Sequence, residues 1–371
     1  MTERTLDPKI RTRFTRPLLQ WYEAAGRDLP WRTNRDPYAI WVSEIMLQQT
    51  QVATVRPYFL RFLNAFPTIA DLAAADLEKV LKLWQGLGYY ARARHLHRAA
   101  SEVMTRFSGR LPATFEGLHS LPGIGRSTAG AILTIAFNKR YPILDGNVRR
   151  VLCRFFKIKE DPRGKSVEDW LWACSETLMP QKNRAGVYLQ AIMDLGATIC
   201  TPRQPDCAVC PVRKHCEARR AGLQETLPLK PVRKKIPHFD YFAGLLVCED
   251  QVLIHRRPLT GLLAGLWEFP GARIDTPVTA RLSITDYFER FFKKAMHQNF
   301  NNARLSMTIR HVFTHFKMTL HVFSVELRGQ VPVQFPYKWV QRDALHEYAF
   351  STAHQKIVSA LPDLSNRPRL F

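Results

Sequence analysis

The sequence predicts a multidomain protein, with an all-α part at the N-terminus and an α+β part at the C-terminus. Apolar side chains recur at helical spacing over residues 8–216, a basic, proline-rich stretch follows, and alternation with a period near two begins after Phe239. A length of 371 residues also suits two domains better than one. The expected boundaries are 1–222 for the helical domain, 223–238 for a linker and 239–371 for the second domain.

The N-terminal part is predicted to consist of helices that glycine and proline separate. Asp36-Pro37 favours a helix start, because the carboxylate can cap and proline fits the first turn. Residues Tyr38 to Val52 then show apolar side chains at helical spacing. Further helices are expected over residues 71–84, 91–107, 127–137, 147–156, 167–178 and 184–195.

The C-terminal part is predicted to be a sheet with accompanying helices. The linker text LPLKPVRKKIP has no periodic apolar face, and its Arg233-Lys234-Lys235 block suits either solvent or a phosphate backbone. Beyond it, β-branched and aromatic residues alternate with polar ones. Strands are expected over 241–247, 251–256, 307–313 and 319–327, and helices over 343–345 and 354–361.

Composition narrows the class of protein. The formal net charge is +22, spread over both halves, which favours a polyanion or an anionic membrane surface as partner. A basic protein without such a partner is the alternative. No apolar run approaches the roughly 18 residues of a membrane span, and the N-terminus does not resemble a secretory signal. Seven cysteines do not suit a fully paired secreted protein, so we expect an intracellular, cytoplasmic location.

Four cysteines within 17 residues form the strongest local signal. Cys200, Cys207, Cys210 and Cys216 have the spacing C-x6-C-x2-C-x5-C, which suits a compact cage of four thiolates. Soft thiolates select zinc or an iron–sulfur cluster, and the spacing alone leaves both open. The other three cysteines stand apart in sequence and are interpreted as small core residues.

A glycine-containing turn forms the second signal. LHSLPGIGRSTAGAILTIAF, residues 118–137, suits a helix, a tight turn at Gly123 and Gly125, and a second helix. The free N–H groups of such a turn and of the following helix favour a DNA phosphate as ligand. An ordinary helix–helix turn is the alternative. Asp145, in LDGNVRRVL, suits a helix cap or a carboxylate held near the mouth of this hairpin.

Together these features resemble the endonuclease III superfamily of DNA glycosylases over residues 8–220. The resemblance rests on the glycine hairpin, on the Asp some 20 residues after it and on the four-cysteine pattern. It implies an all-α helix-hairpin-helix glycosylase domain with a 4Fe–4S cluster in the loop 200–216. The resemblance, and not the spacing, thus decides between zinc and iron–sulfur.

Two features indicate the branch of the superfamily. Bifunctional members place a Schiff-base lysine in the first turn after the hairpin, where this chain has Ser127, so no amine is available for lyase chemistry. The segments LPWR (29–32), WVSEIMLQQTQV (41–52), GLGYYARAR (86–94) and QAIMDLGATIC (190–200) closely resemble the MutY family of adenine glycosylases. That family removes adenine mispaired with 8-oxoguanine.

Cleavage of an N-glycosidic bond to adenine needs a proton on the leaving base and negative charge beside the developing oxocarbenium ion. Glu44 suits the acid, because its apolar neighbours favour the protonated form. The resemblance implies that it protonates adenine and then helps to activate water. Asp145 suits the charge stabiliser, with or without a transient covalent adduct. Asn147 and Ser127 would line the same pocket, although some family members carry tyrosine at the Ser127 position.

The adenine must leave the base stack before it reacts. By resemblance, Gln49 and Tyr89 enter the duplex beside the lesion. Trp31, Arg32 and Gln190 would hold the flipped adenine. The alternatives are core aromatics for Trp31 and Tyr89, and a solvent-facing side chain for Gln49.

The C-terminal domain is expected to recognise the lesion. GLLAGLWEFPG, residues 261–271, resembles the opening of a nudix-like fold, but the metal-binding R-E-x-x-E-E run is missing. Phe313, Thr314 and His315 resemble the Phe-Ser-His loop with which MutY proteins read 8-oxoguanine. Thr314 keeps the hydroxyl and adds a methyl group. The alternative is a strand with alternating core aromatics.

The sequence therefore predicts a monomeric adenine DNA glycosylase that acts on double-stranded DNA with A:8-oxoguanine or A:G mispairs and does not act at membranes. A thymine-glycol or general mismatch glycosylase is one rival. A nucleotide-pool hydrolase or a non-catalytic DNA-binding redox protein is another.

Overall fold

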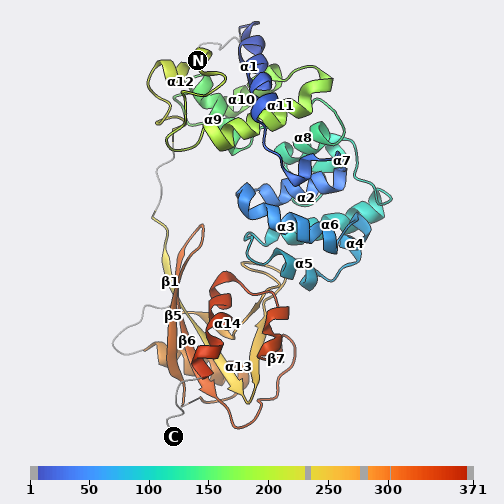
Figure 1. The fold of residues 1–371 in the computed structure, drawn as a ribbon. Helices are drawn as coiled ribbons and strands as arrows, with labels where there is room; N and C mark the ends of the chain where they lie inside the picture. Colours follow the sequence, from blue (N-terminus) through green and yellow to red (C-terminus); the bar gives the residue numbers. More distant parts are fainter. Residues whose placement is uncertain (1–6, 230–234, 276–282, 301, 366–371) are drawn as a thin grey trace. The chain divides into compact units, whose positions relative to one another are not determined.

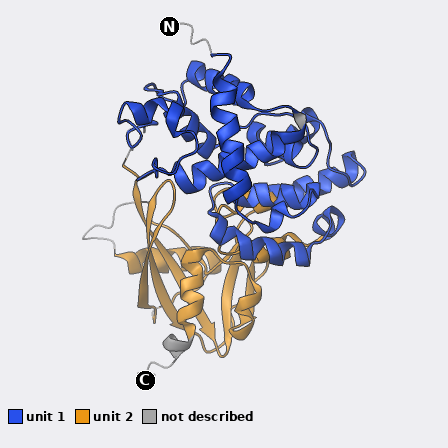
Figure 2. Ribbon diagram, turned by 45° about the horizontal axis from the view of Figure 1, so that its top comes forward, with its two compact units in different colours: residues 1–74, 95–233 blue, residues 75–94, 234–371 orange. Residues whose placement is uncertain are grey.

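The structure is a computed structural model that describes residues 7–229, 235–275, 283–300 and 302–365 (Figure 1). It divides into two compact units, which Figure 2 colours separately: residues 1–74 with 95–233, and residues 75–94 with 234–371. The expected linker falls partly on residues 230–234, which lie outside the described residues. None of the described helices combines the length and the apolar character needed to cross a membrane.

The first unit is helical, as expected. Its elements are α1 (Ile10–Ala25), η1 (Pro30–Arg32), α2 (Pro37–Leu47), α3 (Val52–Ala65), α4 (Ile69–Ala74), most of α6 (Ala91–Arg106), α7 (Phe115–His119), α8 (Arg126–Ile135), α9 (Gly146–Phe155), α10 (Lys165–Leu178), α11 (Lys182–Asp194), η2 (Leu195–Ile199), η3 (Arg213–His215) and α12 (Glu217–Arg220). A core of large side chains joins α1 to α8, α9, α10 and α11, with Phe14 of α1, Leu152 of α9 and Tyr188 of α11 fully buried in it.

Helix α2 begins as predicted and ends earlier. The Asp36 carboxylate accepts hydrogen bonds from the N–H groups of Tyr38 and Ala39, at 3.1 and 3.2 Å, with Pro37 in the first turn. The predicted continuous helix to Val52 is wrong, because Gln49 adopts a left-handed backbone with φ of 57°. A new helix, α3, starts at Val52. The predicted helix over 71–84 is likewise divided, into α4 and α5 (Leu77–Trp84).

The second unit is built on one mixed, seven-stranded sheet. Its strands are β1 (His238–Cys248), β2 (Gln251–Arg256), β3 (Trp267–Glu268), β4 (Gly271–Arg273), β5 (Arg304–Val312), β6 (Lys317–Glu326) and β7 (Tyr337–Gln341). The order is β3-β2-β1-β6-β5, with β4 paired to β1 and β7 paired to β2. Only β1 and β6 pair in parallel among the described strands.

Alternate residues of β1 face two separate cores, because successive side chains of a strand point to opposite faces. Ala243 and Leu245 pack in the core with helix α14 (Thr352–Ser365). Phe242 and Leu246 pack in the core with helix α13 (Ile284–Met296). The sheet is therefore covered on both faces, which the four predicted strands alone did not indicate.

Residues 75–94 belong to this second unit through side-chain contacts. Trp267 Nε1 donates to Glu78 Oε1 at 2.6 Å, and Lys82 Nζ donates to the carbonyl of Tyr348 at 3.0 Å. The expected boundaries followed chain order and assigned this segment to the helical domain, and they stay a prediction. The contacts place the segment in one compact unit with the sheet, across 189 residues of sequence for the Trp267 bond.

Candidate active site and four-cysteine centre

A cleft of about 1240 Å3 opens in the first unit, between the N-terminal turn of α8, the N-terminus of α9, α2 and α11. Ten of the residues singled out in the sequence line it. They are Trp31, Arg32, Glu44, Gln49, Gly123, Gly125, Ser127, Asp145, Asn147 and Gln190. The chain thus brings the predicted catalytic and adenine-binding residues to one place from five separate segments.

The glycine hairpin forms one wall of this cleft. Gly123 has a φ of +81°, and a Cβ atom there would lie 2.9 Å from Cβ of His95, so both the backbone conformation and the space require glycine. Gly125 stands at the N-cap of α8 with an open space beside it, and its backbone is an ordinary extended one. The first glycine therefore shapes the turn, and the second leaves the helix N-terminus uncovered.

Asp145 is the N-cap of α9. Its Oδ1 accepts the N–H of Val148 at 2.7 Å. Burial raises the pKa of Asp145, while the hydrogen bonds from α9 and the charges of Arg150 and Arg149 oppose that rise. Ser127 ties α8 to the same place, because its Oγ accepts the N–H of Leu144 at 3.1 Å.

Asn147 is fixed by its neighbours on both sides. Its Oδ1 accepts a hydrogen bond from Arg150 Nη2 at 2.8 Å. A Cβ atom on Gly196 would lie 2.7 Å from Cβ of Asn147, so the glycine in the π-helix η2 permits the close approach. A π-helical turn of this kind often marks a functional site.

Glu44 projects into the cleft from α2. Its pKa is raised to about 7, chiefly by burial and also by the negative charge of Asp145, while Arg32 opposes the rise. The apolar neighbours that motivated the prediction, Trp41 and Ile45 among them, are almost fully buried. Two carboxyl groups therefore face one cleft in different environments, which is the arrangement that separates an acid from a carboxylate.

The side chains expected to hold adenine already have partners within the protein. Trp31 is buried and packs edge-on against Phe59, with ring centroids 5.3 Å apart. Both terminal nitrogens of Arg32 donate to Asp194, at 2.8 and 2.9 Å. Gln190 Oε1 accepts the hydroxyl proton of Tyr22 at 2.8 Å.

The remaining predicted DNA-binding residues lie in the second unit. Tyr89 is 44% exposed, has a left-handed backbone with φ of 50°, and its hydroxyl lies 3.3 Å from the Thr314 hydroxyl. Phe313 stacks on Phe316 with centroids 4.6 Å apart, and His311 packs against its edge. Phe313, Thr314 and His315 thus lie between β5 and β6, where the strand is interrupted. Phe313 and Phe316 also pack against the core and Phe323 is buried, in agreement with the core-aromatic alternative.

The four cysteines line one small cavity together with apolar side chains and with charged ones that include Arg154, Arg213 and Arg219. Their thiols are free of disulfides, and burial raises the pKa of Cys207, Cys210 and Cys216. The four cysteines are half-buried, and soft thiol donors are the residue type that an iron–sulfur core takes. Their side chains as placed in the described part of the chain do not form a group of three or more that could hold a metal ion, so the fit rests on the type of donor and on the shared cavity.

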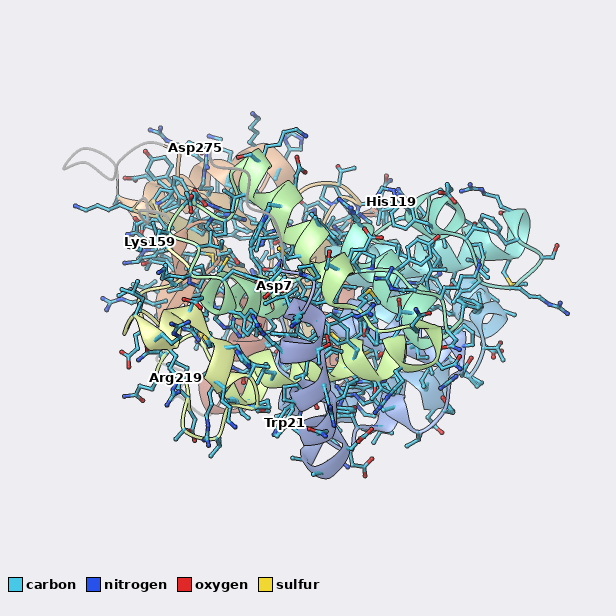
Figure 3. The ribbon with its side chains drawn as sticks, turned by 90° about the horizontal axis from the view of Figure 1, so that it is seen from above. Asp7, Trp21, His119, Lys159, Arg219 and Asp275 are labelled. Atoms are coloured by element: carbon cyan, nitrogen blue, oxygen red, sulfur yellow. The ribbon has the colours of Figure 1, made fainter. Side chains whose placement is uncertain are left out.

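Arginines of α9 connect this loop to the cleft. Arg154 is 2% exposed, and its Nη1 donates to Cys200 Sγ at 3.3 Å and to the Thr201 carbonyl at 2.7 Å. Arg150, one turn earlier, donates to the Cys200 carbonyl at 2.7 Å. Arg219, labelled in Figure 3, belongs to α12, which follows the last cysteine.

Sequence reasoning missed the polar residues that hold the site residues in place: Tyr22, Arg27, Arg150, Arg154 and Asp194. The signal available for Asp194 was that it is the single charged residue in the segment QAIMDLGATI. It is 1% exposed, and buried carboxylates are rare unless they are paired.

The fold and the cleft define a helix-hairpin-helix DNA repair protein. The family model described as HhH-GPD superfamily base excision DNA repair protein matches residues 42–176, and the NUDIX domain model matches residues 242–360. A thermostable thymine-DNA glycosylase structure, 30% identical, matches with a TM-score of 0.52 over 57% of this chain and 98% of that one. A trapped endonuclease III–DNA covalent intermediate, 22% identical, matches with a TM-score of 0.51 over 59% and 100%, which shows the shared fold.

Curated relatives narrow the class. Human adenine DNA glycosylase is 37% identical over 93% of this chain and 73% of its own length. The rat adenine DNA glycosylase is 38% identical over 93% and 77%. The chain belongs to the adenine DNA glycosylase family. It is thus a base excision repair enzyme that hydrolyses an N-glycosidic bond, and its C-terminal unit is a nudix-like domain.

Proposed function

We propose that this glycosylase removes adenine mispaired with 8-oxoguanine or guanine in double-stranded DNA, as a monomer and without cutting the strand. The observation that carries the proposal is the pair Glu44 and Asp145, which face one cleft beside the glycine hairpin. A cleft in a basic helical unit suits a flipped base, since duplex DNA buries the reacting atoms of adenine in its stack.

Glu44 supplies the proton. With a pKa raised to about 7 by burial, a large share of Glu44 is protonated at neutral pH, so it can donate to a ring nitrogen of adenine. Loss of the base leaves the Glu44 carboxylate in place to activate water. Asn147 and Ser127 hold the walls of this pocket through their bonds to Arg150 and to the Leu144 backbone.

Asp145 stabilises the developing oxocarbenium ion. The N–H of Val148 and the positive charges of Arg149 and Arg150 favour its carboxylate form. Among the described residues, the only positive charge that lowers the pKa of Glu44 is that of Arg32. A carboxylate here serves either as a counter-charge or as a transient nucleophile at the sugar. Both routes end in the same products, free adenine and an abasic site.

The cleft offers no amine for Schiff-base chemistry. Ser127 occupies the first turn of α8, and the described residues that line the cleft include arginines but no lysine. An imine between enzyme and sugar needs a primary amine, so strand cleavage by that route is not expected.

Gln49 and Tyr89 are proposed to enter the duplex beside the lesion. Both have left-handed backbones at exposed turns, which lift their side chains from the surrounding helices. The exposed turn that carries Thr314 and His315 is proposed to read 8-oxoguanine in the opposite strand. Phe313 would pack beside that base with Phe316 supporting its ring.

Cys200, Cys207, Cys210 and Cys216 are proposed to hold a 4Fe–4S cluster. Support comes from the four-thiol cavity and from the Arg154 N–H on Cys200 Sγ, a bond that stabilises a ligated thiolate. When bound, the cluster would order the loop 200–216.

Single-turnover excision on four duplexes tests the proposal: A opposite 8-oxoguanine, A opposite G, A opposite T, and thymine glycol opposite A. Cleavage that needs alkali at the first two, with A opposite T intact, is expected. Cleavage without alkali at thymine glycol would contradict it and favour a bifunctional enzyme.

The matched variant Glu44→Gln should abolish excision and keep duplex binding, because it removes the acid and no phosphate contact. Loss of binding in fluorescence anisotropy would contradict this role.

Phosphate release from nucleoside triphosphates is the test of the hydrolase rival. We expect none, since the nudix-like helix α13 carries only Asp286 and Glu289 as acids, and Asp286 is engaged in a capping box with Ser283.

A further inference from the structure

Asp194 is a buried carboxylate that no step of the proposed mechanism uses. It stands at the end of α11, 1% exposed, and receives hydrogen bonds from two arginines. Arg27 contributes its backbone N–H at 3.2 Å and its Nε at 2.9 Å, and its Nη2 also bonds Asp194. Arg32 contributes Nη1 at 2.9 Å and Nη2 at 2.8 Å. Such a bidentate pair fixes the plane of the Arg32 guanidinium.

The same guanidinium starts a chain of hydrogen bonds that leads into the cleft. Arg32 Nη1 donates to the Tyr22 hydroxyl at 3.2 Å, and Tyr22 donates to Gln190 Oε1 at 2.8 Å. Arginine can only donate, so the Tyr22 proton is left for Gln190. The Gln190 amide oxygen therefore faces Tyr22, and the amide NH2 is left to face elsewhere.

Charge connects this chain to Glu44. Arg32 and Asp145 are the two charged groups that shift the pKa of Glu44, Arg32 downward and Asp145 upward, while Arg126, Arg150 and Glu168 line the same cleft. A paired Arg32 exerts a weaker positive field than a bare one, because Asp194 carries the opposite charge 2.8 Å away. Burial opposes ionisation of Asp194, and the bonds from Arg32 and Arg27 outweigh it and keep its pKa low.

We propose that Asp194 and Tyr22 are positioning residues of the adenine pocket: Asp194 aligns Arg32 and balances its charge beside Glu44, and Tyr22 sets the orientation of the Gln190 amide. The inference rests on the proposed function, in which protonated Glu44 is the acid and Gln190 faces adenine. Neither Asp194 nor Tyr22 touches the reacting atoms in this assignment.

The pH profile of single-turnover excision tests the Asp194 role. The rate constant needs protonated Glu44, so it should fall above a midpoint near pH 7 in the unaltered enzyme. Asp194→Asn leaves the positive charge of Arg32 unbalanced and should move this midpoint down by about one pH unit. Arg27→Gln leaves more of the Asp194 negative charge to offset Arg32. It should therefore move the midpoint up, by a smaller amount than Asp194→Asn moves it down.

The opposite signs separate positioning from damage to the fold. Asp161→Asn, which removes a carboxylate hydrogen-bonded to Arg163 away from the cleft, is the matched control and should leave the midpoint in place. If Asp194→Asn does not fold, Arg27→Gln, at a side chain 27% exposed, still gives the test. A lower rate with an unmoved midpoint in both variants would overturn the inference.

A double-mutant cycle on the excision rate constant tests the role of Tyr22. Tyr22→Phe and Gln190→Leu should each lower the rate constant, and the double variant should lose no more than the worse single one, because both act through one bond. A double variant whose loss in rate constant equals the product of the two single losses would overturn the Tyr22 role. A profile without a falling limb in the unaltered enzyme would instead count against Glu44 as the acid, so the two failures are distinguishable.

Discussion

At the scale of single residues, environment assigns different roles to chemically similar side chains. Glu44 and Asp145 are both carboxylic acids in one cleft, yet Asp145 caps a helix and Glu44 does not. Burial raises the pKa of both carboxyl groups. At Asp145 the N–H of Val148 and the charges of Arg150 and Arg149 oppose that rise, and this opposition distinguishes the proposed charge stabiliser from the proposed acid.

The raised pKa of Glu44 has a consequence for stability. The folded state holds the Glu44 proton up to about pH 7, and the unfolded state loses it near the ordinary value of 4.5, so the proton-linked stability at Glu44 declines as pH rises between these values. Glu44→Gln should therefore raise the free energy of unfolding at pH 8 by about 1–2 kcal/mol and change it little at pH 4.5. Urea denaturation at the two pH values measures this.

The control for this prediction is Glu102→Gln, at a partly exposed α6 side chain paired with Arg106. It should show no such pH-dependent gain. An equal rise in the free energy of unfolding of Glu44→Gln at both pH values would mean that burial does not raise the pKa of Glu44.

At the scale of elements, ends and turns hold most of the site. The cleft is lined by the ends of α2, α8, α9 and α11, and Gln49 and Tyr89 both stand in left-handed turns. The helical periodicity that predicts α2 does not show where the helix stops, because the polar residues 48–51 suit a solvent-facing helix turn as well as a break before α3. The helix α13 was missed for a related reason: its text is rich in aromatic residues, which suit strands and helices alike.

The cysteine loop should depend on its ligands. Cys216→Ala should lower the iron content and the visible absorbance of the purified chain and lower its thermal midpoint, since a bound cluster stabilises the fold that holds it. Cys153→Ala, at a buried core cysteine outside the loop, is the matched control and should keep the iron. Iron loss from both variants to the same extent would point to general destabilisation.

Helix α5 should depend on the nudix-like domain. Trp267→Phe removes the hydrogen bond to Glu78 and should cost about 1–2 kcal/mol of local stability. Hydrogen exchange should then speed up in the α5 amides. Trp339→Phe, whose indole bonds the Val331 carbonyl within the second unit, should leave α5 exchange unchanged. Unaltered α5 exchange in Trp267→Phe would show that this contact does not hold the helix.

At the scale of the whole molecule, charge sets the interaction with DNA. The net charge of +22 lies on both halves of the chain, so phosphate contacts should come from more than one region. Neutralised phosphates release counterions, and each makes binding more sensitive to salt.

Binding to an undamaged duplex should weaken by about 10³-fold between 50 and 200 mM salt, as for a protein that makes about six phosphate contacts. Anisotropy titrations over a salt series measure the slope, with an uncharged osmolyte at matched osmolality as the control. A nearly flat dependence would mean that the basic surface does not contact the backbone.

The sequence by itself determined the class of fold, the helix caps and the glycine at the hairpin turn, and it supplied the four cysteines proposed to hold a cluster and the residues proposed for catalysis. These features are local, since a cap, a left-handed turn or a close-spaced ligand set depends on neighbouring residues. Only the tertiary structure decided the rest. It paired Asp194 with Arg32 across 162 residues, placed Tyr22 on Gln190, and grouped residues 75–94 with the sheet. Such contacts join segments distant in sequence, so no local pattern specifies them.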